Sequence, residues 1–142
     1  DPPEPTPNID ATIEAGIAAT MVGVAIEKGV AATMAASSSV VTHIDKAATY
    51  MDRGEYENAI QEFDKVIQLD PSHVLAYNGR AAAYHELGQY ERAIQDYNKA
   101  IQLDPGNAMA YGNRGNAYRH LGQDANAAAD EVKACSLDSY YC

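Results

Sequence analysis

The feature of this chain that most constrains its fold is a repeat of 34 residues. Shifting the sequence against itself by 34 places Gly54 on Gly88 and on Gly122. Thirteen of the twenty-two residues in 50–71 recur unchanged in 84–105. Repeats of this length are typical of solenoids, in which each unit buries its apolar face by stacking on its neighbours. The sequence therefore predicts a stack of three copies of one structural unit.

Each copy contains two runs of apolar residues at helical spacing. In the second copy the first run is Tyr77, Ala81 and Tyr84, and the second run includes Tyr90, Ala93, Ile94, Tyr97, Ala100 and Ile101. The aligned glycines stand where a left-handed residue would end the first helix. Because proline disfavours helix in the residue before it, Asp70-Pro71 and Asp104-Pro105 are expected to end the second helix. We predict an all-α solenoid of three helical hairpins, at about 40–73, 74–107 and 108–142.

The second copy resembles the tetratricopeptide repeat (TPR). The residues at the signature positions of that family are Tyr77, Ala81, Tyr84, Gly88, Tyr90, Ala93, Tyr97, Ala100 and Pro105. The resemblance extends over about 40–142 and implies that Ala81 and Ala93 allow close helix packing, while the tyrosines lie mainly in the core. The first copy departs from the pattern at His43, and the third departs at Asp124, Glu131 and Ser139. Such atypical terminal copies are usual in solenoids.

Residues 1–39 do not follow the repeat. The Pro-rich segment 1–7 is expected to be an extended linker, because proline has a fixed φ and no amide donor. Residues 8–36 are rich in Ala, Ile, Val and Met and contain no Pro, which predicts one long helix that ends at the serines 37–39. We therefore expect the segment 8–39, a helix with its linker, to precede the repeat domain.

The predicted helix carries apolar residues on two sides, because a duplication of thirteen residues rotates the second set by about 220°. These residues are Ile9, Ile13, Ile17, Met21, Val24, Ile26, Val30 and Met34. We predict that the helix docks on the repeats of a neighbouring copy, which gives a head-to-tail homo-oligomer or an open filament. An outer face of the third repeat with Val132, Leu137, Tyr140 and Tyr141 lacks a following helix and supports this interpretation. In the alternative, the helix bends near Gly23 and caps its own first repeat.

The N-terminal segment also resembles the Pro/Thr-flanked, Ala-rich stretches that precede repeats in bacterial surface proteins. This resemblance implies an extracellular or cell-surface location, with a cytoplasmic location as the alternative. In an extracellular protein Thr6, between prolines, would be a candidate for O-glycosylation, and the alternative is an unmodified linker.

Composition and motifs disfavour several functions. The chain has 10 Lys and Arg against 20 Asp and Glu, a net charge of -10, which disfavours nucleic acid as a partner. No uncharged run reaches the ~18 residues of a membrane span. The group His85, Glu86 and His120 is a candidate metal or acid/base site, and the alternative is ordinary solvated side chains. With no zinc-type spacing and no Gly-rich phosphate loop, we expect no enzyme activity, no metal and no cofactor.

The two cysteines, Cys135 and Cys142, are seven residues apart. Three states are open: two free thiols with Cys135 buried, a local disulfide that folds the tail back, or an intermolecular bridge.

The resemblance to the TPR family also implies a concave groove for ligands, lined by the first helix of each repeat. The corresponding positions here are Val41, Ile44, Ala48, Met51 and Asp52; Leu75, Asn78, Ala82, His85 and Glu86; and Met109, Gly112, Asn116, Arg119 and His120. The subfamily that clamps a terminal carboxylate has Lys and Asn where Ile44 and Ala48 stand, so that role is disfavoured. The alternative to self-assembly is thus a monomeric scaffold that binds a separate peptide or protein in this groove.

Overall fold

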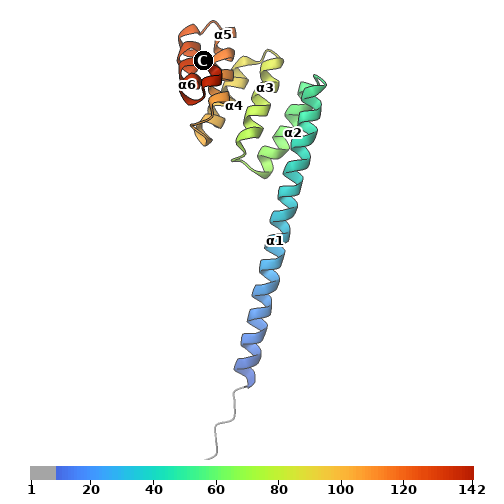
Figure 1. The fold of residues 1–142 in the computed structure, drawn as a ribbon. Helices are drawn as coiled ribbons and strands as arrows, with labels where there is room; N and C mark the ends of the chain where they lie inside the picture. Colours follow the sequence, from blue (N-terminus) through green and yellow to red (C-terminus); the bar gives the residue numbers. More distant parts are fainter. Residues whose placement is uncertain (1–8) are drawn as a thin grey trace, which may run out of the picture. The chain divides into compact units, whose positions relative to one another are not determined.

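The structure, a computed structural model, describes the backbone of residues 9–142 and the side chains of residues 25–142. Over this range it contains helices and no strand. The elements are α1 (Ile9–Asp52), α2 (Tyr56–Leu69), α3 (Val74–Glu86), α4 (Tyr90–Leu103), α5 (Ala108–His120), α6 (Asp124–Leu137) and a short 3-10 helix, η1 (Ser139–Tyr141) (Figure 1). The predicted all-α fold is confirmed. None of the described helices is both long and apolar enough to cross a membrane.

The predicted ends of the hairpin helices are correct. Gly54, Gly88 and Gly122 have φ values of 72°, 71° and 71°, the left-handed conformation that ends each first helix. The second helices α2 and α4 end one residue before Asp70 and Asp104. The carboxylate of Asp70 accepts bonds from the Ser72 amide at 3.0 Å and hydroxyl at 2.7 Å, which stabilises the turn into the next repeat.

The predicted helix end at the serines 37–39 is wrong. These residues lie inside α1, which continues through them to Asp52 and so includes the first helix of the first repeat. Thr33 indicates why hydroxyl residues do not break this helix: its Oγ1 donates to the Gly29 carbonyl four residues earlier, at 2.9 Å. The chain divides into two compact units, residues 1–38 and 39–142, and the boundary falls within α1.

The core of the unit 39–142 is built where small residues let helices approach. Ala47, Ala81 and Gly115 occupy equivalent positions in the three repeats, and all are buried. Around them the core forms two clusters, one with Ala47, Ala59, Phe63, Val66, Ala76 and Ala83, and one with Tyr77, Ala81, Ala93, Tyr97, Ala100 and Ala110.

The tyrosines follow the prediction only in part. Tyr77 and Tyr97 are buried and Tyr140 is exposed, whereas the other repeat tyrosines are half-buried. Among the half-buried tyrosines, Tyr50, Tyr56 and Tyr84 pack against the core clusters, as is usual for this amphipathic side chain.

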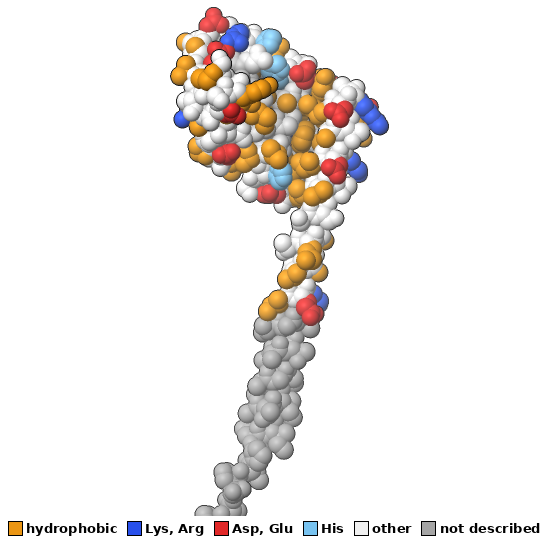
Figure 2. All heavy atoms as spheres, viewed as in Figure 1, with side chains coloured by type: hydrophobic (Ala, Val, Ile, Leu, Met, Phe, Trp, Pro, Cys, Tyr) orange, Lys and Arg blue, Asp and Glu red, His pale blue; other side chains and the backbone are white. Residues whose placement is uncertain are grey.

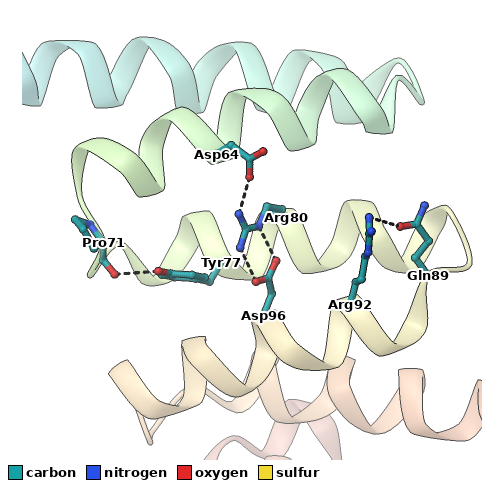
Figure 3. A network of polar contacts seen from close by, with 7 residues as sticks. All are labelled: Asp64, Pro71, Tyr77, Arg80, Gln89, Arg92 and Asp96. Atoms are coloured by element: carbon teal, nitrogen blue, oxygen red, sulfur yellow. Dashed lines mark hydrogen bonds and ion pairs between the residues drawn. The ribbon is translucent and has the colours of Figure 1, made fainter.

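An arginine at the same position of the second and third repeats ties neighbouring helices together. Arg80 of α3 donates from Nε and Nη2 to Asp96 of α4, both at 2.7 Å, and from Nη1 to Asp64 of α2 at 2.5 Å (Figure 3). Arg114 of α5 repeats this geometry with Asp130 at 2.6 and 2.7 Å and Asn98 at 2.6 Å. Hydrogen bonds to these carboxylates raise the pKa of both guanidinium groups, so both stay charged. This network was not predicted from the sequence, although its arginines and aspartates recur at the 34-residue period.

Lys46 stands at the arginine position of the first repeat, where a different network holds α1 to α2. Glu62, which is buried, bonds to His43 Nδ1 and to Lys65 Nζ, both at 2.6 Å. Burial raises the pKa of the Glu62 carboxyl, but the bonds from Lys65 and His43 outweigh it and hold that pKa below 4.5.

Candidate functional site

The first helices of the three repeats expose a row of apolar side chains. Val41, Leu75 and Met109 stand at equivalent positions and are 57%, 61% and 39% exposed. Large exposed apolar side chains are unremarkable singly, but their recurrence at one position of each repeat is typical of a contact surface. All three are positions that the resemblance assigned to the groove.

Asn78, one helical turn before Ala82 on the same face of α3, is 4% exposed. Neither its Nδ2 nor its Oδ1 has a hydrogen-bond partner among the described residues. A buried amide without partners costs free energy, on the order of 1–3 kcal/mol per group. In native proteins such a group is bonded to protein or to water, so this amide needs a partner, a water or a ligand, that the described residues do not supply.

A small cavity of about 130 Å³ has Ala82, one helical turn after Asn78, in its lining. It is lined by Ala82, His85, Glu86, Tyr97, Asn113 and Asn116, which come from α3, α4 and α5. His85 Nε2 is also buried without a partner in the described residues. Burial, with the negative charges of Glu86 and Asp96, raises the pKa of the Tyr97 hydroxyl, which therefore stays protonated. The cavity offers donors and acceptors for a polar group.

The two histidines of the candidate metal or acid/base site, His85 and His120, do lie close together, and the ring of Tyr90 packs with them. The rings of His85 and His120 lie 5.2 Å apart, and Tyr90 stacks on His120 with 4.6 Å between ring centres. Glu86 is 3.8 Å from His85 Nδ1. Within the described residues no group of three or more His, Cys, Asp or Glu side chains is arranged to hold a metal ion.

The charged groups at the groove positions do not favour an anionic ligand. Arg119 is ion-paired with Glu131 of α6, so its charge is neutralised. Asp52 and Glu86 are exposed at the ends of their helices. The other groove positions vary in exposure: Ile44, Met51 and Ala82 are half-buried, whereas Ala48 and Asn116 are exposed.

The tail after α6 folds back in the third repeat. A disulfide joins Cys135 and Cys142, the local bridge among the three states considered. Tyr141 lies against Gly112, where an added Cβ would be 3.0 Å from the tyrosine ring. The predicted outer face is therefore partly covered: Tyr141 is half-buried, while Val132, Leu137 and Tyr140 remain exposed. Nothing in the sequence around Tyr141 predicted this contact.

On the N-terminal helix, Ile26, Val30 and Met34 are 60%, 50% and 68% exposed. Figure 2 shows hydrophobic side chains along these residues of α1. The other predicted assembly residues, Ile9, Ile13, Ile17, Met21 and Val24, lie outside the described side chains, and so does Thr6.

The stacked hairpins define a helical-repeat domain, a class of fold that presents extended surfaces for binding. A family model described as TPR repeat matches residues 48–88 and 83–122. The chain belongs to the TPR repeat family, whose domains mediate interactions between proteins.

Several solved structures are similar. The first TPR of Spaghetti (RPAP3) bound to the HSP90 peptide SRMEEVD is 28% identical, with a TM-score of 0.71 over 72% of this chain and 82% of that chain. The Arabidopsis OM64 TPR domain is 28% identical, with a TM-score of 0.72 over 74% and 87%. The second TPR domain of human RPAP3, in complex with the HSP70 peptide SGPTIEEVD, is 29% identical, with a TM-score of 0.70 over 73% and 87%. No curated protein matches the chain.

Proposed function

We propose that this chain is a non-enzymatic binding domain that takes a peptide segment of another protein in its concave groove. The observation that carries the proposal is Asn78, a buried amide with neither a donor nor an acceptor satisfied. An amide side chain offers one acceptor and two donors, which is the pattern that pairs with a peptide unit of an extended chain. The similar RPAP3 domains are described with bound peptides, which supports this class of ligand.

The peptide proposed here is apolar rather than acidic. The row of Val41, Leu75 and Met109 offers apolar contacts, and the groove positions supply Asp52 and Glu86 as exposed charges. An anionic peptide such as SRMEEVD would meet like charges at Asp52 and Glu86, while Arg119 is already paired with Glu131, which costs binding free energy. Peptides with two or three apolar side chains and no acidic cluster suit this surface.

Selection from a peptide library against the intact chain tests the proposal. We expect enrichment of apolar, non-acidic sequences, and we expect SRMEEVD to bind no better than its scrambled version. Asn78→Ala and Leu75→Asp should each weaken binding of a selected peptide about tenfold or more. Asn58→Ala is the matched control, since Asn58 is exposed and bonds only to Glu55 on the same helix turn. Equal binding by Asn78→Ala and the control would refute the proposal.

A second candidate function is self-assembly, which the exposed residues Ile26, Val30 and Met34 favour. Exposing an apolar stripe on one side of a helix to water is unfavourable in free energy, and docking on another copy would remove these side chains from solvent. Head-to-tail contacts of this kind give oligomers or filaments. Sedimentation of the intact chain and of a chain without residues 1–38 tests this candidate: the intact chain should be oligomeric and the shortened chain monomeric.

An extracellular or bacterial cell-surface location belongs to the same proposal. The Cys135–Cys142 disulfide supports it, because disulfides persist mainly in oxidising compartments. Differential alkylation of the two cysteines in protein isolated from its native source tests the location. Fully reduced thiols would contradict it.

A further inference from the structure

The end of the solenoid formed by α5 and α6 contains an open pocket of about 680 Å³. Gly112, Asn116 and Arg119 line it from α5, Glu131 and Val132 line it from α6, and Tyr141 lines it from the tail. Three of its lining residues, Gly112, Asn116 and Arg119, are also groove positions, whereas the apolar row of Val41, Leu75 and Met109 does not line it.

The repeat shows what kind of element such a face accepts. Shifted by 34 residues, Asn116, Arg119 and Glu131 correspond to Ala82, His85 and Tyr97 of the second repeat. In the second repeat these three side chains line a small cavity together with Asn113 and Asn116 of α5, and Tyr97 shares a core cluster with Ala110 of α5. In the second repeat, the equivalent face of α3 and α4 is therefore covered by a helix, α5. In the third repeat the tail covers only part of that area.

The chemistry of the terminal face differs from that of the internal faces. Asp64 and Asn98 accept the arginine of the following repeat, whereas the next equivalent position is Val132, which is 72% exposed. A further hairpin of the same type, with an arginine at this position, would lose the acceptor that Asp64 and Asn98 give to Nη1 of Arg80 and Arg114. Arg119 and Glu131 neutralise each other at the floor of the pocket. The face thus favours a helix with an apolar, uncharged side.

Residues 26–34 of α1 have these properties. Ile26, Val30 and Met34 are spaced four residues apart, so they lie on one side of the helix over about 12 Å, and each is at least half exposed. The charges within 25–38 are one acidic residue, Glu27, and one basic residue, Lys28, in a chain whose net charge is -10. This is a nearly neutral segment that can approach an acidic partner without repulsion.

We propose that the α5–α6 pocket is the acceptor for the Ile26–Val30–Met34 side of α1 from a second copy of this chain. This inference rests on the proposed self-assembly and names the surface that performs it. The donor helix and the acceptor pocket are different surfaces, so the contact is heterologous.

The experiment uses intact chains and sedimentation velocity over a concentration series. Val132→Asp in the acceptor and Val30→Asp in the donor should each weaken self-association about tenfold or more, because each would bury an unpaired carboxylate. Leu69→Asp is the control for Val132→Asp, since Leu69 is an exposed apolar residue of α2 outside the pocket. Ala32→Asp is the control for Val30→Asp, because two residues rotate it to the other side of the helix. Circular dichroism checks that every variant keeps its helices.

Mixing the two defective variants gives the decisive result. Each retains one intact half of the contact, so the mixture should form one-to-one dimers and nothing longer, whereas each variant alone stays monomeric. If Val30→Asp abolishes assembly while Val132→Asp does not, self-assembly through α1 stands and this acceptor is wrong. If the wild-type chain is monomeric at every concentration, both the self-assembly and this acceptor pocket are wrong. The peptide-binding proposal is not affected by that result.

Discussion

The ring of Phe63 in α2 lies directly against the Cα of Gly79 in α3. A Cβ added at residue 79 would be 2.6 Å from Cε1 and 2.8 Å from Cε2 of that ring, with Cζ closer still. We predict that Gly79→Ala destabilises the domain by about 1–3 kcal/mol, the usual cost of overpacking a core. Thermal or urea unfolding followed by circular dichroism measures this change.

A control separates the steric cost from the general effect of replacing glycine in a helix. Gly29 has open space around its Cα, so Gly29→Ala should not destabilise the protein. The double variant Gly79→Ala/Phe63→Leu should recover part of the loss, because the smaller side chain makes room. A Gly79→Ala protein as stable as the wild type would contradict this account of the contact.

The planar guanidinium of Arg80 reaches two helices at once, which a lysine cannot reproduce. Arg80→Lys should lose at least one of the three bonds to Asp64 and Asp96 and destabilise the domain by roughly 1–3 kcal/mol. Arg92 provides the matched control in Figure 3, since it bonds to Gln89 at 3.2 Å on the exposed surface. Arg92→Lys should change the stability by less than about 0.5 kcal/mol. Equal effects of the two variants would argue against a bridging role for Arg80.

At the scale of elements, the left-handed glycines determine where the first helices end. Gly88 has φ of 71° and no atom near the place of a Cβ, so its substitution tests the backbone conformation alone. Gly88→Ala should cost about 1–2 kcal/mol, whereas Gly88→Asn should cost less, because asparagine tolerates this conformation better. Unfolding midpoints of the two variants give the comparison. If alanine is tolerated as well as asparagine, backbone strain is not what selects glycine here.

The contact of α1 with α2 depends on pH through Glu62. Its pKa in the folded protein lies below 4.5, so its stabilising effect is complete above that value and is lost as the pH falls through the folded pKa. Glu62→Gln should therefore be less stable than the wild type near pH 7, by roughly 1–3 kcal/mol, and the difference should shrink on acidification below 4.5. Urea unfolding at a series of pH values checks this. A difference that stays constant down to acidic pH would show that the charge of Glu62 contributes nothing.

The elements that the sequence predicted well are those with local signals. Left-handed glycines and Asp-Pro pairs act on their own backbone, so the hairpin ends at Gly88 and Asp104 were predictable. The serines 37–39 carry no such constraint: no Gly or Pro stands there, and hydroxyl side chains are compatible with a helix. The groove positions came from the resemblance to the family. The burial of Asn78 without hydrogen-bond partners depends on how the helices pack together, and a local sequence pattern does not show this.

At the scale of the whole molecule, the repeat domain is a chain of neighbour contacts. The element pairs in contact include α2 with α3, α3 with α4, α4 with α5, α5 with α6, α6 with η1, and the first helices of adjacent repeats, α3 with α5. In such an arrangement stability is close to a sum over repeats and their interfaces, so a local defect should spread only to the adjacent repeat.

The C-terminal disulfide allows a test of this property without any change in the core. In the variant Cys135→Ser/Cys142→Ser the tail loses the bond that holds Tyr141 against Gly112, so 138–142 should detach and the adjoining turns of α5 and α6 should open more often. Hydrogen exchange measured by mass spectrometry should accelerate there by about tenfold or more, because exchange reports local opening. Peptides from α2 should exchange at the wild-type rate, since two repeat interfaces separate this helix from the tail. Wild-type protein treated with a dithiol reductant should behave like the variant. Uniform acceleration along 39–142 would mean that the domain opens as one cooperative unit, and it would contradict the neighbour-only description of this solenoid.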